Sequence, residues 1–460
     1  MTLLDTHTSP RHLNLPLSPK QANSVGMAFR RKHALWVGAV GAGKTVSSLL
    51  SFLMAINDVP PGGLIVIVGN TIQSIERNVI GPLQDPALYG AIARQVHHTN
   101  GSNRVVIMGR QVELIGASNA LAVGRIRGST IALAYVDEMT LLTKDFWEML
   151  LTRLRVHDAS GQNVSRLLGT TNPASKNHWL RTGWLKQQDA TNSIGFHLTM
   201  DDNPTVTAEE RALYERMYAG LFYQRMILGR WTNATGAVYD MWDPDTMSIP
   251  WSKLPPMQDL ICVGVDHGNT NPTSAIMLGV TSEYDAKGWH PRPRLVLVDE
   301  WRYEPDEGAG RPRLTNVQQS AALRGWMRQF HTPGSEVLRP RHLFVDPAAA
   351  DFRLQLTADR MPNAPANNDV LAGISSVSSL LQQGRLLVAR PDVEDDNDGR
   401  GVNGWLKEVT EYSWDAKQTK KGEDAVVKAN DHSLDSGRYG VHSSRGIWEP
   451  LFRRVYGVAA

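Results

Sequence analysis

Residues Gly38-Ala-Val-Gly-Ala-Gly43-Lys44-Thr45 decide the fold of the first half of the chain. They match the pattern G-x-x-x-x-G-K-T, follow an apolar run and open a helix-like stretch. In that setting Gly38, Gly41 and Gly43 let the loop turn its backbone N–H groups onto phosphates, helped by the positive end of the helix. Lys44 would reach the β- and γ-phosphates of ATP, and the Thr45 hydroxyl would bind Mg²⁺. The motif predicts an ATP-binding P-loop domain.

A pair of acids at the end of a later strand supports this interpretation. The apolar run Ile131–Val136 is followed directly by Asp137 and Glu138. Asp137 would hold Mg²⁺, directly or through water, and Glu138 would polarise the water that attacks the γ-phosphate. The spacing from the P-loop therefore predicts ATP hydrolysis as well as binding.

Two further segments each have a functional and a plain structural interpretation. Thr170-Thr171-Asn172 follows the next strand, where Thr171 and Asn172 could sense the γ-phosphate and couple hydrolysis to movement. Because proline follows Asn172, the segment could equally be an ordinary turn. Upstream of the P-loop, Gln21 either presents its amide to the adenine edge or belongs to a simple helix start.

A second group of acids lies in the second half of the chain. Asp266 and Asp346 each end an apolar strand, and Asp431-His432-x-x-Asp435 reads as a helix start. His432 and Asp435 share one face of that helix, and Asp431 lies one turn from Asp435. Carboxylates brought together in this way can form a hard oxygen site for Mg²⁺ or Mn²⁺. Two such ions would support cleavage of a phosphodiester bond.

Other charged segments of this half remain open. Each aspartate alone could be a strand or helix cap, and Glu300 is either an extra ligand or a surface acid. The acidic segment 394–399 resembles a calcium loop, but Trp405 stands where the last glutamate belongs, so we interpret it as solvated. The basic run 417–428 is either a solvated surface or a hairpin that grips phosphates.

The order of apolar runs and helix-like stretches predicts the fold class. Short β-branched runs alternate with helical patterns, which is typical of α/β proteins with a mostly parallel sheet. The proline-rich stretch 236–257 predicts a linker. We therefore expect a P-loop ATPase domain over residues 1–235 and an α/β nuclease domain over residues 258–460.

Composition limits the alternatives. The 460 residues carry a net charge of only +2, so DNA contacts must come from local basic patches. The one cysteine, Cys262, excludes an internal disulfide and fits a reducing compartment. We see no signal peptide, and the apolar runs are too short to span a bilayer. We expect a protein of the cytoplasm with no membrane partner.

Taken together, these motifs resemble a known family, the large terminase subunits of tailed bacteriophages. A P-loop with Asp137-Glu138 and Thr170–Asn172 is followed by Asp431-His432-x-x-Asp435-x-x-x-Tyr439. The resemblance covers roughly residues 15–445, and the closing motif is its most specific part. It implies that the second domain has an RNase H-like fold.

The resemblance also implies site residues and partners. Asp266, Asp346 and Asp435 would be the nuclease metal ligands, assisted by His432. The interval from Asp266 to Asp346 is longer than is usual in the family, so Glu300 remains an alternative ligand. An arginine finger, Arg127 or its neighbour Arg125, would complete the ATPase site. The implied partners are double-stranded DNA, a small terminase subunit and the portal protein of a procapsid. The protein would form a ring, transiently docked on the procapsid in the host cytoplasm, and cut concatemeric DNA.

Two other functions compete with this interpretation. A different P-loop DNA translocase with a nuclease, of the repair or restriction type, would usually have a second ATPase-like core domain. The second half instead has strands that end in aspartate, such as Asp266 and Asp346. A scaffold that merely binds nucleotide would require both acidic sites to be accidental.

Overall fold

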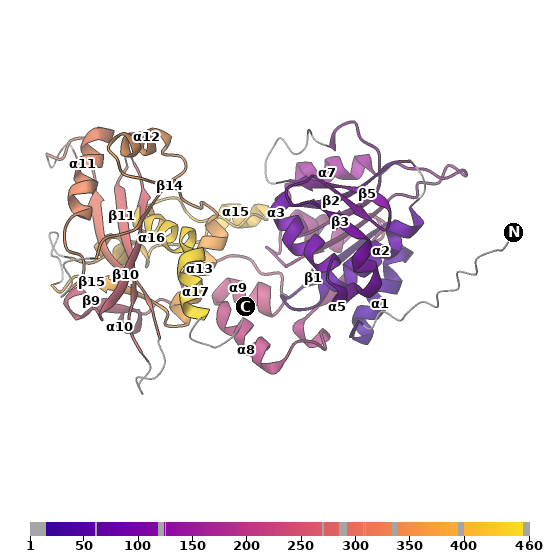
Figure 1. Cartoon of the computed structure of the whole chain (residues 1–460), viewed down its shortest axis with the longest axis horizontal. Helices are drawn as coiled ribbons and strands as arrows, with labels where there is room; N and C mark the ends of the chain where they lie inside the picture. Colours follow the sequence, from indigo (N-terminus) through magenta and orange to yellow (C-terminus); the bar gives the residue numbers. More distant parts are fainter. Residues whose placement is uncertain are drawn as a thin grey trace. The chain divides into compact units, whose positions relative to one another are not determined.

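The computed structural model describes residues 15–59, 62–117, 124, 126–268, 271–284, 292–306, 308, 310–333, 338–393 and 400–453. The chain forms two compact units (Figure 1). Unit 1 comprises Met1–Glu215, Tyr223–Asn233 and Lys420–Glu423. Unit 2 comprises Arg216–Phe222, Ala234–Thr419 and Asp424–Ala460.

Unit 1 is built on an eight-stranded sheet with the order β3-β4-β5-β2-β6-β7-β1-β8. Its strands are β1 (His33–Gly38), β2 (Leu64–Gly69), β3 (Val96–His98), β4 (Arg104–Ile107), β5 (Arg110–Gly116), β6 (Ile131–Val136), β7 (Arg166–Thr171) and β8 (Ser193–Leu198). All pairings from β5 to β8 are parallel, and only β3-β4 and β4-β5 are antiparallel. The carboxyl ends of β1, β6 and β7 therefore meet at one edge, where the P-loop and the Asp-Glu pair begin.

Helices flank this sheet. The longer ones are α1 (Pro19–Met27), α2 (Lys44–Asp58), α7 (Lys144–Arg153) and α8 (Ala208–Met217). Shorter turns are α3 (Ile72–Ile75), α4 (Gly81–Leu83) and α5 (Pro86–Tyr89), and π-helical turns occupy Glu76–Ile80, Arg181–Leu185 and Tyr223–Ile227. The short turn α9 (Gly220–Phe222) belongs to unit 2. Strands β1 and β6 are buried along their whole length, which explains their continuous apolar sequence.

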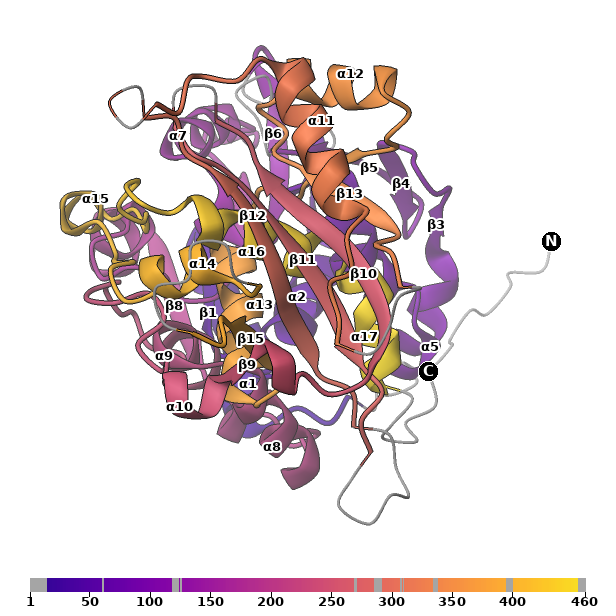
Figure 2. The same ribbon diagram turned by 90° about the vertical axis from the view of Figure 1, so that its left-hand side faces the viewer.

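Unit 2 contains a seven-stranded sheet with the order β14-β13-β10-β11-β12-β15-β9. Its strands are β9 (Ser248–Pro250), β10 (Met257–Asp266), β11 (Thr273–Thr281), β12 (Leu295–Tyr303), β13 (His342–Val345), β14 (Ala364–Pro365) and β15 (Leu386–Arg390). Strands β10, β11 and β12 form an antiparallel meander and run side by side in Figure 2, and β13 joins β10 in parallel. Its helices are α10 (Pro244–Met247), α11 (Asn316–Met327), α12 (Ala350–Ala358), α13 (Val370–Gln382), α14 (Asn403–Glu408), α15 (Ala416–Lys421), α16 (His432–Ser443) and α17 (Arg445–Arg453).

Both faces of this sheet are covered. On one face α11 and α12 contribute Leu323 and Phe352 to a core with alternate residues of β10 such as Val263. On the other face α13 and α16 contribute Ile374 and Leu434, among others, to a core with the remaining β10 residues. The even burial of both faces explains why β10 and β11 show no polar alternation in sequence.

Helix α16 lies unusually close to β10, and glycines permit the approach. A Cβ atom on Gly264 would clash with the backbone of Ser436 and Gly440 of α16. The thiol of Cys262 donates to the carbonyl of Gly440 (3.4 Å) and is fully buried, as expected for an inert cysteine. This contact fixes the helix that carries His432 and Asp435 against the strand that ends in Asp266.

The fold class predicted from the sequence, a mostly parallel P-loop sheet followed by a second α/β unit, is confirmed. The residues predicted to be a linker, 236–257, instead contain α10 and β9, and β9 pairs with β15. They are counted in unit 2 because Val238 and Tyr239 are buried in its core. Among the described residues, none of the helices combines the length and apolar character that a membrane span requires.

Candidate functional site

The P-loop lies between β1 and α2, and its glycines have conformations that other residues rarely adopt. Gly41 and Gly43 have φ values of 66° and 76°. Gly38 ends β1 with φ 154°, and a Cβ atom there would clash with the carbonyl of Leu198. The loop therefore needs glycine at these positions. It ends at the first turn of α2, where free backbone N–H groups can bind a phosphate.

Lys44 is buried at the first position of α2. Its Nζ donates to the carbonyls of Gly38 (3.0 Å) and Ala39 (2.5 Å) and to Oδ1 of Asn172 (2.9 Å). Burial lowers the pKa of Lys44 to about 8, although the charges of Asp137 and Glu138 oppose this effect. The structure thus brings Lys44 together with Asn172, the predicted sensor at the end of β7.

Asp137 is held by two side chains at the end of β6. Its Oδ1 accepts a hydrogen bond from Thr170 (2.9 Å) and its Oδ2 accepts one from Asn78 (3.1 Å), and the residue is 5% exposed. Glu138 has φ 53°, a left-handed conformation that costs a non-glycine residue about 1 kcal/mol or more. Burial, and then the neighbouring Asp137, raise the pKa of Glu138, which makes its carboxylate a stronger base.

Three other predicted nucleotide residues have partners inside the protein. The Thr171 hydroxyl lies 2.7 Å from that of Thr140, and the Thr45 carbonyl accepts from Ser48 (3.1 Å). Gln21 uses both ends of its amide, because Oε1 accepts from the Ser18 backbone (2.9 Å) and Nε2 donates to the carbonyl of Ala42 (3.0 Å). Gln21 completes the capping box of α1 and supports the P-loop, which favours the helix-start interpretation over the adenine contact.

The candidate arginine finger is only partly described. Arg127 is exposed and follows the buried Ile126, whereas Arg125 lies outside the described residues. Sequence reasoning missed Arg77, whose charge is close enough to lower the pKa of Glu138 against the effect of burial. It also missed Asn78, which no motif marks.

In unit 2 the predicted acids line one pocket. Because β10 and β13 are parallel and Val265 is in register with Val345, the residues that follow them, Asp266 and Asp346, lie side by side. Helix α16 brings the other members to the same pocket. The lining of this pocket includes Asp266, Asp346, Asp431, His432, Asp435 and Lys428.

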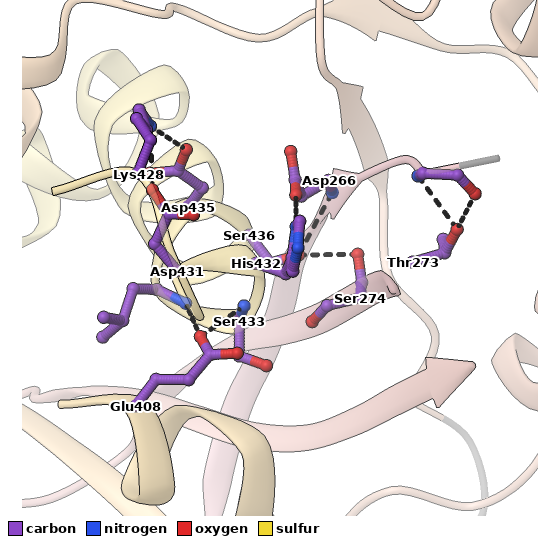
Figure 3. Close-up of polar contacts among 12 residues, drawn as sticks. Asp266, Thr273, Ser274, Glu408, Lys428, Asp431, His432, Ser433, Asp435 and Ser436 are labelled. Atoms are coloured by element: carbon purple, nitrogen blue, oxygen red, sulfur yellow. Dashed lines mark hydrogen bonds and ion pairs between the residues drawn. The ribbon is translucent and has the colours of Figure 1, made fainter. Parts of the chain in front are cut away.

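Asp266 forms a hydrogen-bonded pair with His432, shown in Figure 3. Nδ1 of His432 lies 2.8 Å from Oδ2 of Asp266. The hydrogen bond to Asp266 raises the pKa of His432. Burial raises the pKa of Asp266, the bond from His432 opposes it, and the charges of Asp435 and Asp346 add to the rise. The pair is therefore a local ion pair whenever His432 is protonated.

Asp431 and Asp435 are joined by a lysine (Figure 3). Nζ of Lys428 lies 3.0 Å from Oδ2 of Asp431 and 2.9 Å from Oδ2 of Asp435. The other oxygen of Asp435 accepts from Nη2 (2.8 Å) and Nε (3.2 Å) of Arg438, which is 1% exposed. Within the described part of the chain, Asp435 thus has two cationic partners and Asp431 has one.

These side chains match a divalent cation in chemistry but not in spacing. Carboxylate oxygens are the donors that Mg²⁺ and Mn²⁺ prefer, and four aspartates line one pocket. Across the described ranges, however, no group of three or more Asp, Glu, His or Cys residues stands close enough to hold an ion. Asp266 is turned toward His432, and Asp431 and Asp435 are turned toward Lys428. Asp346 accepts a hydrogen bond from the backbone N–H of Ala348 (3.0 Å).

Glu300, left open as a ligand, supports α16 from outside the lining of the pocket. Its Oε1 accepts from Ser274 (2.9 Å) and Ser433 (2.5 Å), and its Oε2 accepts from the Gly404 backbone (2.7 Å). Glu408 acts beside it, because its Oε2 accepts from the backbone N–H groups of Ser433 (2.8 Å) and Leu434 (3.1 Å). Glu300 is thus a half-buried structural acceptor and not an exposed surface acid, while its role as a metal ligand stays a prediction.

The two other open segments have different outcomes. The acidic segment 394–399 lies outside the described residues. The basic run 417–428 contains the end of α15, and the backbone segments around it pair through Asp415 N to Ala425 O (2.8 Å) and Val427 N to Ser413 O (2.9 Å). An isolated antiparallel bridge between Trp414 and Val426 thus closes a helical turn. The two interpretations of the run, a solvated surface or a hairpin that grips phosphates, stay predictions.

The two units define the class of protein: a mostly parallel P-loop sheet followed by a second α/β unit, which is the two-domain fold of large terminases. Residues 35–242 match the family "Terminase large subunit, T4likevirus-type, N-terminal". Over this range, and in its two-domain fold, the chain is similar to the large terminase subunits of phages.

Individual relatives agree with this assignment. The solved large terminase of a thermophilic bacteriophage is 28% identical, with a TM-score of 0.77 over 94% of this chain and 99% of that one. The same protein in complex with ADP gives 27% identity and a TM-score of 0.77, covering 93% of this chain and 99% of that one. The large terminase subunit of Escherichia phage T5 is 27% identical over 167 residues, which is 34% of this chain and 33% of that protein. The match to the T5 protein therefore spans about a third of its length.

Proposed function

We propose that unit 1 hydrolyses ATP to drive double-stranded DNA into a procapsid and that unit 2 cuts concatemeric DNA when packaging starts and ends. The observation that supports this most directly is the meeting of Lys44, Asp137 and Asn172 at the carboxyl edge of one sheet. The relative from the thermophilic phage, which has the same fold, is described in complexes with ADP and with ATP-γ-S. The ATPase part corresponds to unit 1, close to the expected residues 1–235, and the nuclease part corresponds to unit 2, which adds residues 234–257 to the expected 258–460.

In unit 1 the roles follow from the contacts. Gly38, Gly41 and Gly43 bind phosphates through the loop, and Lys44 moves from the loop carbonyls onto the β- and γ-phosphates. Thr45 and Asp137 would hold Mg²⁺, which would supply positive charge to the transferred phosphate. Glu138, whose pKa is raised, takes the proton of the attacking water. Asn172, with Thr171 beside it, loses its hydrogen bond to Lys44 when nucleotide binds. The loss of this bond couples nucleotide binding to the end of β7.

In unit 2 the acids of the pocket provide the cutting site. We assign metal binding to Asp266, Asp346 and Asp435, with Asp431 as the fourth carboxylate. A divalent cation, Mg²⁺ with Mn²⁺ able to replace it, would lower the pKa of water for attack on the phosphodiester. His432 is hydrogen-bonded to Asp266, so it orients that carboxylate and can move a proton at its Nδ1 atom.

Partners are inferred from the family. We propose that the protein acts as a homo-oligomeric ring on the portal of the procapsid in the host cytoplasm and receives DNA from a small terminase subunit. Arg127 is exposed, which allows it to reach the ATP of a neighbouring copy. The cofactors are ATP and Mg²⁺.

The test compares two point variants of the whole chain. Wild-type protein is incubated with plasmid DNA and Mn²⁺ or Mg²⁺, with and without ATP. Lys44→Ala should stop ATP turnover and leave metal-dependent nicking, whereas Asp266→Asn should lower nicking by orders of magnitude and leave ATP turnover. If Asp266→Asn nicked plasmid at the wild-type rate, the cutting site would have to lie elsewhere.

A further inference from the structure

Lys428 occupies a position that its sequence neighbours do not suggest. Its Nζ lies within 3.0 Å of one oxygen of Asp431 and one of Asp435, while its own side chain is 57% exposed. The two carboxylate side chains are each 9% exposed. A long cationic side chain thus reaches from the surface into the pocket and ends between two buried acids.

The other carboxylate oxygens of α16 and β10 also have positively charged or protonatable partners. His432 pairs with Asp266, and the buried Arg438 holds the second oxygen of Asp435. Arg438 is fixed by burial, whereas Lys428 belongs to a segment whose residues 427–430 are exposed. Of the two cationic partners of Asp435, Lys428 is therefore the one that can leave at little cost.

We infer that Lys428 is a built-in counter-ion that stands where a divalent cation would bind, and that it must withdraw before the cation enters. This inference rests on the proposed nuclease function. It explains why four aspartates share one pocket without standing at metal-binding distances from one another. Two acids held by one ammonium avoid mutual repulsion while no divalent cation is bound.

The exchange has a consequence for DNA. The backbone of DNA is a row of phosphates that attract lysine side chains. A phosphate near the pocket would draw Lys428 outward and leave Asp431 and Asp435 with an unbalanced charge, which favours a divalent cation. Metal and DNA should therefore each raise the affinity for the other, since coupling between two ligands is reciprocal.

The experiment measures Mn²⁺ binding to the full chain by calorimetry, without nucleotide or DNA. The unit 2 signal is defined as the part that Asp266→Asn removes. Lys428→Ala should tighten this signal about fivefold to tenfold, because two partly exposed ion pairs no longer compete with the ion. Lys428→Met keeps the apolar stem and should act in the same way. Lys417→Ala, an exposed lysine of the same basic run, should leave the affinity unchanged.

A second measurement adds a short DNA duplex with a phosphorothioate backbone that resists cutting. The duplex should tighten Mn²⁺ binding to wild type and to Lys417→Ala, but much less to Lys428→Ala. Unchanged or weaker Mn²⁺ binding in both folded Lys428 variants would overturn the inference. Loss of cutting in Lys428→Ala with unchanged Mn²⁺ affinity would overturn it too, and would make Lys428 a substrate contact. If Asp266→Asn removed no signal, the proposed metal site itself would fail.

Discussion

Glu408 should control the stability of α16, the helix that carries the proposed nuclease residues His432 and Asp435. It is 4% exposed, and its Oε2 accepts from the backbone N–H groups of Ser433 and Leu434 in the first turn of α16. Asp431 precedes that turn but makes no side-chain capping bond. Oε1 of Glu408 accepts from Arg302 (2.6 Å). One buried carboxylate thus serves as the cap of α16 and as the partner of an arginine.

The expected cost of Glu408→Ala follows from these contacts. Loss of a helix cap costs about 1 kcal/mol, and removal of one partner of a buried ion pair costs about 3–5 kcal/mol. Because Arg302 keeps some solvent exposure and the terms overlap, we expect about 3 kcal/mol in total. Burial raises the pKa of Glu408 despite Arg302 and the two amides, so its charge is costly in itself. Glu408→Gln should therefore be milder, at about 1–2 kcal/mol.

The assay is hydrogen exchange of peptides that cover residues 430–445, together with thermal unfolding. A local loss of about 3 kcal/mol should accelerate exchange of the α16 amides about 100-fold. The matched control is Glu411→Ala, an exposed glutamate three residues further on, which should change stability by less than about 0.5 kcal/mol. If Glu408→Ala exchanged no faster than Glu411→Ala, the capping argument would be wrong.

Three further predictions concern unit 1. Burial lowers the pKa of His33 to about 4, so between pH 6.5 and 4 the unfolded chain binds a proton that the folded chain does not. Acidification to pH 4 should thus cost roughly 3 kcal/mol of stability, and His33→Gln should show a flatter pH dependence in chemical denaturation; an identical slope would contradict this. Asn78→Ala frees one oxygen of Asp137 and should lower the kcat of ATP hydrolysis about tenfold, with Asn78→Asp worse because it adds a like charge; full activity in both would remove Asn78 from the site. Mixing Arg127→Ala with Lys44→Ala protein should restore some ATPase activity, and no recovery under conditions where wild type assembles would count against a finger in trans.

The sequence alone was enough to predict an element where its local apolar pattern agrees with its burial in the fold. The strand–glycine loop–helix at residues 33–58 and the strand before Asp137 could be predicted because both are continuously apolar and their strands are fully buried. Asp266 and Asp346 could be expected at one edge because apolar runs end at both. Strand β8 could not be predicted in this way, since its buried and partly exposed residues show no clear alternation.

Side-chain partnerships could not be predicted in the same way. Nothing in the spacing of Lys428 shows that it reaches Asp431 and Asp435, because that contact depends on how the chain enters α16. Glu300 lies at the end of an apolar run just as a ligand would, yet it accepts hydrogen bonds from α16 and from Gly404. The roles of all candidate site residues stay predictions until the variants are measured.

The pairing of β9 with β15 limits how the protein can be divided. Strand β9 precedes β10 in sequence but lies at the far edge of the unit 2 sheet, next to β15. A truncated gene that starts at residue 258 would encode a sheet whose β15 edge has lost its partner and whose core lacks Val238 and Tyr239. Such an exposed edge invites pairing between copies and insoluble product. Cloning of a separate nuclease should therefore begin near residue 234, where unit 2 resumes.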